Sequence, residues 1–309
     1  MNDSQAVHVI GAPLDLGAGC RGCRMGPDAI RCAGLLTRLR QQGRMVQDLG
    51  DVTLTEREKL SADSAGGHPK AKYIDEIVRF NRRLHRKTAA SVEAGAIPLI
   101  LGGDHSIAAG TIAGAARHKR IGVLWFDAHG DLNTVQTSPS GNVHGMPLAA
   151  MLGYGYPALK HIGGKRPKVR PEHLVLIGTR SLDTGEQELI QRAGIRMYAS
   201  RELHRLGMSE VVRQALAAAG EGTDGIHVSF DLDGLDPGEA PGVGTPVSAG
   251  MRLTEALEAM RVIAASGLLV SAEFVEVNPA LDLRSKTAHA AVELICSLLG
   301  SDTMEEKSR

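Results

Sequence analysis

Short apolar runs alternate with longer amphipathic ones along almost the whole of the 309-residue sequence. Several of the apolar runs are nearly unbroken in Val, Ile, Leu and Ala, a pattern typical of strands that are buried on both faces. Six runs have the length and composition of such strands. The predicted strands are Val7–Gly11, Ile97–Gly102, Ile121–Asp127, His173–Gly178, Ile226–Asp231 and Leu268–Val277.

The stretches between these strands show helical periodicity. This strand–helix alternation predicts an α/β fold in which helices cover both faces of a parallel sheet. Because nothing resembles a linker, we expect a single domain over residues 1–309, with a surface loop at Thr53–Lys72 and a frayed tail at 302–309. The predicted helices are Asp28–Gln41, Ile74–Ala94, Ser106–Ala116, Gly185–Ala193, Met208–Ala219, Leu253–Ala265 and Lys286–Leu299.

The charge balance excludes some classes of partner. Thirty-five Lys and Arg residues offset 35 Asp and Glu residues, so no net charge steers the chain toward nucleic acid or anionic lipid. The segment Met1–Gln5 lacks the basic and apolar regions of a signal peptide, and no apolar run is long enough for a membrane span. We expect a cytoplasmic protein that binds neither nucleic acid nor membrane.

Four cysteines are too few for a disulfide scaffold at this length. Cys20 and Cys23 have C-x-x-C spacing, but no second pair follows that would complete a zinc site. We interpret them as incidental thiols in a glycine-rich loop, with a redox or metal role as the alternative.

Unusual polar clusters fall where five of the predicted strands end. In parallel α/β sheets, ligands bind beyond the carboxyl ends of the strands, so these clusters are expected to converge on one rim. They are Gly103-Asp104-His105, Asp127–Asn133, Arg180–Glu186, Asp231–Asp236 and Glu276-Val277-Asn278.

Two of these clusters indicate a metal site. Asp127, His129 and Asp131 occupy alternate positions, which point the same way in extended backbone. Asp231 and Asp233 repeat the pattern, and a further histidine, His105, follows a third strand. A single Asp-x-His is most often a turn or a helix cap. So many carboxylates gathered without a cation would repel one another strongly.

The ligand types narrow the choice of metal. Carboxylates with imidazole and no thiolate favour manganese over structural zinc, with cobalt, nickel or iron as substitutes. Two histidines among four carboxylates suit two ions bridged by a carboxylate and a water. In such sites the bridging water becomes hydroxide near neutral pH and attacks an electrophilic carbon or phosphorus atom.

Three long segments resemble the metal-binding motifs of the ureohydrolase family, in the same order and spacing. They are Gly102–Ser106, Asp127–Asn133 and Ser229–Pro237. The resemblance runs from about Val9 to Leu299 and implies a three-layer α/β/α fold with a mostly parallel sheet of about eight strands. It also implies one Mn²⁺ held by His105, Asp127, Asp131 and Asp231, and a second held by Asp127, His129, Asp231 and Asp233, with Asp131 also orienting the bridging hydroxide.

Within the family, Ser140–Pro147, Glu276–Pro279, the opening Gly11–Gly17 and Gly244–Pro246 resemble arginases. This likeness implies hydrolysis of L-arginine to L-ornithine and urea, and assembly into trimers or hexamers. Glu276 is suited to pair with the guanidinium and His144 to transfer protons. Ser140 and Asn142 would donate to the substrate carboxylate and Asp183 would accept from the α-ammonium, while Asn133, Glu186 and Thr245 would complete the lining.

One departure from the arginase pattern concerns Ser181, where arginases commonly carry an acidic residue. The chain therefore lacks the acidic side chain that would support the contact with the α-amino group of the substrate. Agmatinase or another guanidino-acid hydrolase is the alternative activity, and the Ser140–Asn142 loop distinguishes them, since agmatine has no α-carboxylate. A two-metal phosphoesterase does not fit the histidine spacing, and a non-catalytic paralogue would lack a ligand or His144.

Overall fold

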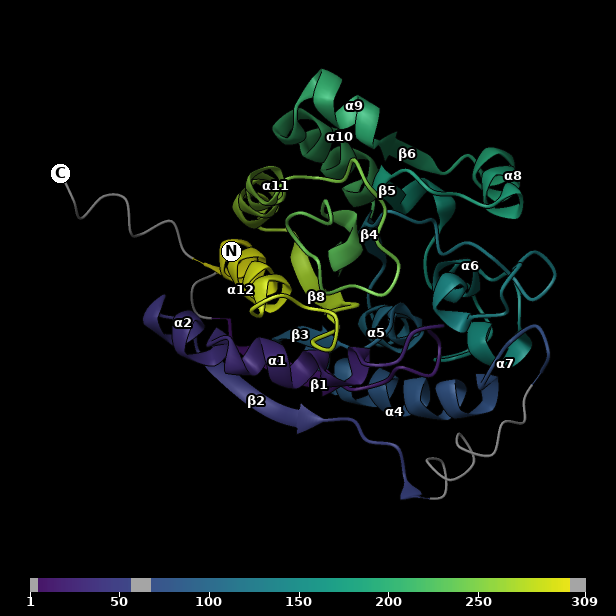
Figure 1. The fold of residues 1–309 in the computed structure, drawn as a ribbon, viewed down its shortest axis with the longest axis horizontal. Helices are drawn as coiled ribbons and strands as arrows, with labels where there is room; N and C mark the ends of the chain where they lie inside the picture. The colour runs from purple at the N-terminus through teal and green to yellow at the C-terminus, as the bar shows by residue number, and fades with distance from the viewer. Residues whose placement is uncertain (1–4, 57–67, 301–309) are drawn as a thin grey trace.

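The computed structural model of the chain describes residues 5–56 and 68–300. In this part an eight-stranded sheet has the order β2-β1-β3-β8-β7-β4-β5-β6, and all neighbouring strands are parallel (Figure 1). The predicted parallel α/β architecture is confirmed. The strands are β1 Val7–Ala12, β2 Val46–Asp51, β3 Ile97–Gly102, β4 Ile121–Phe126, β5 Leu174–Thr179, β6 Arg196–Ala199, β7 Gly225–Asp231 and β8 Leu269–Val275.

Helices cover both faces of the sheet (Figure 1). One layer contains α1 Gly26–Cys32, α2 Leu35–Gln41, α10 Met208–Gly220, α11 Leu253–Ser266 and α12 Lys286–Leu299. The other contains α4 Ile74–Glu93, α5 Ala108–Ala115, α6 Pro147–Met151 and α7 Pro157–Lys160. The shorter helices α8 Thr184–Ala193 and α9 Ser200–Leu206 flank β6.

The sequence of β4 shows why both layers form. Its side chains alternate between the two cores: Leu124 and Phe126 pack with one helical layer, while Val123 and Trp125 pack with the other. All four side chains are fully buried. A strand that is apolar at every position is therefore stable only when helices cover both of its faces.

Several boundaries differ from the sequence prediction. The helix predicted at Asp28–Gln41 is two helices, α1 and α2, because Gly34 adopts a left-handed conformation with φ 92°. The strand predicted to begin at His173 begins at Leu174, since Pro171–His173 forms a 3₁₀ turn. A similar 3₁₀ turn, His105–Ile107, precedes α5.

The sequence prediction missed the two edge strands, β2 and β6. Both are partly exposed and carry polar residues, so neither shows the apolar run that marks a central strand. Residues 57–67 of the predicted loop Thr53–Lys72 and the predicted tail 302–309 lie outside the described residues. In the described part, no helix is both long and apolar enough to cross a membrane.

The sheet order places the five polar clusters side by side. They follow β3, β4, β5, β7 and β8, and these strands are adjacent in the order β3-β8-β7-β4-β5. Because all of the strands are parallel, their carboxyl ends lie along one edge, where ligands bind in such sheets.

Candidate metal centre and active site

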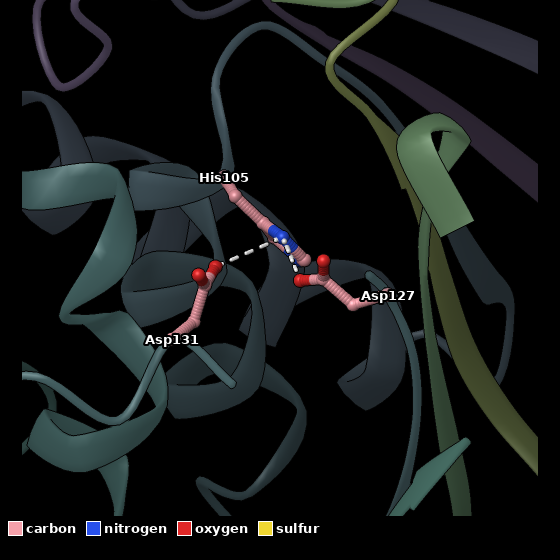
Figure 2. Close-up of side chains that lie close together, drawn as sticks. All are labelled: His105, Asp127 and Asp131. Atoms are coloured by element: carbon pink, nitrogen blue, oxygen red, sulfur yellow. Dashed lines mark ion pairs between the residues drawn. The ribbon is translucent and has the colours of Figure 1, made fainter. Parts of the chain in front are cut away.

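His105 lies at the centre of a group of carboxylates. Its Nδ1 is 3.3 Å from Asp127 Oδ2, 3.1 Å from Asp131 Oδ2 and 3.1 Å from Asp231 Oδ2. Figure 2 shows the imidazole between Asp127 and Asp131. All four side chains are buried.

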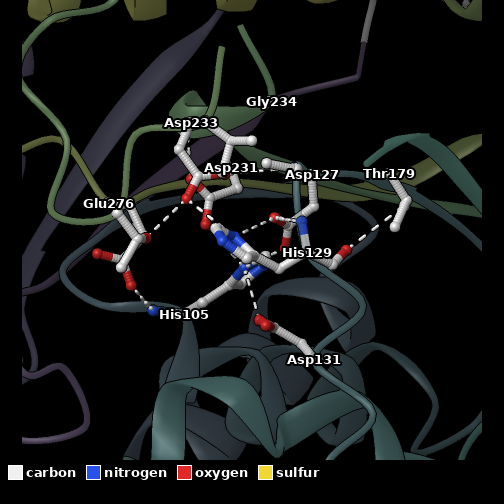
Figure 3. Close-up of polar contacts among 12 residues, drawn as sticks. His105, Asp127, His129, Asp131, Thr179, Asp231, Asp233, Gly234 and Glu276 are labelled. Carbon is white, nitrogen blue, oxygen red and sulfur yellow. Dashed lines mark hydrogen bonds and ion pairs between the residues drawn. The ribbon is translucent and has the colours of Figure 1, made fainter. Parts of the chain in front are cut away.

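A second group surrounds His129. Its Nδ1 is 3.4 Å from Asp127 Oδ1 and 3.2 Å from Asp233 Oδ2. The two oxygens of Asp127 therefore face different histidines, so that this carboxylate belongs to both groups (Figure 3). The structure thus brings together all six residues that the sequence proposed as metal ligands.

Backbone amides fix the orientation of the carboxylates. The amide of His129 donates to Asp127 Oδ1 at 2.7 Å, and the amide of Asp233 donates to Asp231 Oδ1 at 2.8 Å. Asp131 has a positive φ of 50°, which is uncommon for residues other than glycine and occurs often at functional sites. The residues that follow β4 and β7 thereby orient the carboxylates of Asp127 and Asp231.

Residues that the sequence analysis missed hold His105. Its ring stacks on Trp125 with centroids 4.0 Å apart and an interplanar angle of 7°. Its Nε2 lies 2.8 Å from Ser229 Oγ, which donates to Glu273 Oε1 at 2.9 Å. Because Nε2 is occupied, Nδ1 faces the carboxylates. The only available signal was the polar Ser229 and Glu273 within apolar strands.

The clustered charges perturb one another. Burial and the neighbouring carboxylates raise the pKa of Asp231, and burial together with Asp127 raises the pKa of Asp131 to about 6. Burial alone would lower the pKa of His129, but Asp127 and Asp233 raise it to about 12. Because metal ligands bind in their deprotonated form, metal binding to such a group of residues would release protons.

The donor set fits a divalent metal ion. His105 Nδ1 is buried and makes no hydrogen bond within the described residues, although three carboxylate oxygens lie near it. Such an orphaned nitrogen is unusual unless an ion completes its coordination. Imidazole nitrogens with hard carboxylate oxygens suit Mn²⁺ and related divalent ions.

Glu276 and His144 form a polar pair beside this centre. His144 Nδ1 lies 3.0 Å from Glu276 Oε1, which also accepts from the amide of His105 at 2.8 Å. Burial would lower the pKa of His144, but Glu276 raises it to about 9. Glu276 follows β8 directly and has a positive φ of 64°, so its side chain leaves the direction of the strand.

Cys23, interpreted from the sequence as an incidental thiol, contacts Glu276. Its buried Sγ donates to Glu276 Oε2 at 3.2 Å. Burial and Glu276 raise the pKa of this thiol, so it remains protonated and able to donate. The spacing within the C-x-x-C segment gave no indication of this contact. All four cysteines are free.

A cavity of about 120 Å³ opens onto the centre. Of the proposed metal ligands, His129, Asp131, Asp231 and Asp233 line it, together with His144. All six residues proposed for substrate contact also line the cavity, with Ser138 and Gly145, which the sequence analysis did not select. The six are Asn133, Ser140, Asn142, Asp183, Glu186 and Thr245.

Several of the side chains that line the cavity make hydrogen bonds to other protein groups. Glu186 accepts from the amides of Leu132 and Asp183, so both of its oxygens have partners, and burial raises its pKa to about 7. Asp183 accepts from Asn133 Nδ2 at 2.8 Å, and Thr245 donates to Asp233 at 2.9 Å. These contacts order the wall of the cavity.

The Ser140–Asn142 loop is held by Lys72, the last residue of the predicted surface loop Thr53–Lys72. Lys72 Nζ donates to Asn142 Oδ1 at 2.9 Å, and the Lys72 amide donates to Gly141 O at 2.9 Å. Asn142 therefore turns its amide NH₂ group away from Lys72. Within the loop, the Asn142 amide donates to Ser140 Oγ at 3.1 Å.

Arg180 and Ser181 support the centre rather than line the cavity. The Arg180 guanidinium donates to carbonyls that include Asp233 O at 2.8 Å and Val247 O at 2.7 Å, and so holds the segment after β7. The Ser181 amide donates to Ala128 O at 2.9 Å.

The fold and the centre define an α/β protein whose carboxyl-edge site can hold divalent metal. The sequence model of the arginase family matches residues 5–300, and the chain belongs to that family. It is therefore an enzyme, a hydrolase that acts on C–N bonds in linear amidines.

The chain is 50% identical to the arginase of Bacillus caldovelox over 299 residues, which cover 96% of this chain and 99% of that protein. It is 49% identical to the arginase of Bacillus subtilis over 297 residues, covering 96% and 98% respectively. The crystal structure of the Bacillus caldovelox arginase superposes with a TM-score of 0.92 at 49% identity, covering 97% of this chain and 100% of that one.

Proposed function

We propose that this enzyme hydrolyses the guanidino group of L-arginine to L-ornithine and urea. One observation supports this proposal beyond family membership. A single cavity is lined both by the carboxylate–imidazole centre and by Ser140, Asn142 and Asp183, the groups suited to an α-carboxylate and an α-ammonium. A substrate that carries a guanidinium at one end and an amino acid at the other fits this arrangement.

Two Mn²⁺ ions are the proposed cofactor. His105, Asp127, Asp131 and Asp231 would hold one ion, and Asp127, His129, Asp231 and Asp233 would hold the other. When bound, such a pair of ions supplies a water activated for attack near neutral pH. Asp127 and Asp231 would help to hold both ions, and the buried Asp127 belongs to both groups of candidate ligands.

Glu276 is proposed to bind the guanidinium. A guanidinium presents parallel N–H donors to a carboxylate, and charge-assisted hydrogen bonds of this kind fix both distance and orientation. Cys23 and the His105 amide hold the Glu276 carboxylate, so it requires little rearrangement to receive the substrate. The reacting carbon would then lie beside the metal centre, because Glu276 follows the strand next to that of Asp231.

His144 is proposed to carry protons. Its imidazole lines the cavity while its Nδ1 lies against Glu276. A histidine with a raised pKa holds a proton that it can donate to the departing amine, and it can recover that proton from solvent because the side chain is 17% exposed.

The decisive experiment is to compare urea release from L-arginine and from agmatine, after loading with Mn²⁺ and again with a chelator present. We expect arginine to be the far better substrate and chelation to abolish turnover. Turnover of agmatine that equals or exceeds that of arginine would contradict the substrate, and turnover that survives thorough chelation would contradict the metal centre.

Three further properties of the enzyme are proposed on the family resemblance and on the sequence alone. We expect one domain over the chain, a homo-oligomer of three or six subunits and a cytoplasmic location. Sedimentation velocity of the metal-loaded protein would test the second of these, with a monomer as the contradicting result.

A further inference from the structure

A second cavity, of about 660 Å³, lies at the edge of the sheet opposite the active site. It is lined by Ile121, the first residue of β4, by His173, which precedes β5, and by Gly222, in the turn before β7. These positions are at the amino ends of strands whose carboxyl ends carry the metal centre. The two cavities are therefore separated by the length of the strands.

The lining of this cavity is strongly cationic. In the described part of the chain, no aspartate or glutamate lines it. So many positive groups in one concavity create a positive potential that attracts anions. The basic side chains include Arg117, Lys119, Arg120, Lys165, Arg166 and Lys168.

Carboxylates nearby neutralise only part of this charge. Glu93 lies 3.5 Å from Arg117, and Asp224 lies 3.8 Å from Arg120. A third acid, Glu172, lies 3.8 Å from Arg170, another residue of the cavity. The remaining cations of the lining have no carboxylate within 4.0 Å among the residues that the structure describes; they are Lys119, Lys165, Arg166 and Lys168.

Lys168 is fixed in place by the backbone. Its Nζ donates to Gly164 O at 2.8 Å, to Arg166 O at 2.5 Å and to Lys160 O at 3.4 Å. The ammonium thereby closes the loop that carries Lys165 and Arg166. The three N–H donors of Lys168 are used by these carbonyls, so this side chain adds positive charge to the cavity rather than a free donor.

Two imidazole nitrogens near the cavity have unused hydrogen-bonding capacity. His173 Nδ1 and His85 Nε2 are buried and make no hydrogen bond within the described residues. His85 is only 6% exposed, and its Nε2 would lie 2.7 Å from a Cβ placed on Gly163, a residue of the cavity wall. Burial and the cations Arg117, Arg86 and Lys168 lower the pKa of His85, so the excess positive charge reaches this wall.

We propose that this cavity binds a small anion that carries two or more phosphate groups. Its volume lies within the range of about 300–1,000 Å³ that small-molecule sites occupy. An arginine guanidinium can donate hydrogen bonds to two phosphate oxygens at once, and a lysine ammonium adds a further positive charge that attracts the phosphate. The positive charge of the four cations without a carboxylate partner exceeds the negative charge of one carboxylate or one inorganic phosphate. Pyrophosphate and a nucleoside triphosphate share the required chemistry.

The test is calorimetric titration of the Mn²⁺-loaded enzyme with pyrophosphate and, separately, with ATP. Excess Mg²⁺ is present throughout, so that the phosphates do not remove manganese from the active site. Lys165→Ala/Arg166→Ala removes two charges from the cavity. Arg38→Ala/Arg40→Ala removes two exposed charges from α2 and serves as the matched control.

We expect saturable binding of one equivalent per subunit, weakened at least tenfold by the cavity variant and unchanged by the control. Arginine turnover should be the same in all three proteins, which shows that the variants fold. Preference for ATP over pyrophosphate would identify a nucleotide site, and the reverse would identify a free polyphosphate site. Absence of saturable binding, or equal weakening in both variants, would overturn the proposal.

Discussion

His144 Nδ1 lies 3.0 Å from Glu276 Oε1, although 132 residues separate the two side chains in the sequence. This contact joins the loop that carries Ser140 and Asn142 to the end of β8. It also raises the pKa of His144 to about 9, with burial opposing the shift and Glu276 outweighing burial. A group with a raised folded pKa binds its proton more tightly in the folded state than in the unfolded state.

We therefore predict a pH-dependent contribution of His144 to stability in the metal-free enzyme. It should be fully present below the unfolded pKa, about 6.5, and should be lost as the pH rises through about 9. The measurement is the difference in free energy of unfolding between wild type and His144→Gln after chelation, at several pH values. A difference that grows with rising pH would contradict the pairing.

Removing a shared metal ligand should be far more damaging than removing the proposed proton carrier. Asp127→Ala is expected to lose metal and nearly all activity, because both His105 and His129 face this carboxylate. His144→Ala should keep its metal and lose only part of the rate. Atomic emission measures the bound metal, and the exposed His161→Ala is the control. Loss of manganese from His144→Ala would contradict its role in proton transfer.

Glu276→Gln should weaken turnover through loss of charge with little change in shape. Replacing a charge-assisted contact worth about 1.5–3 kcal/mol by a neutral one worth about 0.5–1.5 kcal/mol is expected to lower kcat/KM for arginine by about 5–15-fold. Cys23→Ser retains a donor to Glu276 and serves as the matched control, with a much smaller effect. Steady-state kinetics of urea release checks both variants, and an unchanged kcat/KM for Glu276→Gln would exclude guanidinium pairing.

Asn142→Ala should discriminate between substrates. Arginine has an α-carboxylate and agmatine has none, so loss of this donor is expected to lower kcat/KM for arginine about tenfold and to leave that for agmatine nearly unchanged. Gln136→Ala, an exposed change close by in the chain, is the control. Equal losses on both substrates would indicate a collapsed loop rather than a lost contact.

Trp125 should report metal binding. It is the only tryptophan, it stacks on His105, and its Nε1 donates to Asp127 Oδ2 at 2.9 Å. Adding Mn²⁺ to the metal-free enzyme should therefore change tryptophan emission in a saturable way that chelation reverses. Trp125→Phe should remove the signal. If tryptophan emission stayed constant while metal analysis showed bound manganese, the ion would bind at a site away from Trp125.

Much of this protein could be predicted from local patterns in its sequence. The apolar strands that end in Asp127-Ala128-His129-Gly130-Asp131 and Asp231-Leu232-Asp233 determined both the parallel fold and the side on which the ligands gather, because alternation in extended backbone depends only on neighbouring residues. The break at Gly34 and the polar edge strands β2 and β6 were missed, since their local composition does not distinguish them from loops.

Only the tertiary structure decided which distant side chains meet. Cys23 reaches Glu276, Ser229 and Trp125 hold His105, and Lys72 holds Asn142. The cationic cavity likewise depends on the turn before β4, the loop before β5 and the turn before β7 coming together. Contacts of this kind depend on the order of strands in the sheet and on the packing of loops against it. Local residue patterns do not encode either property.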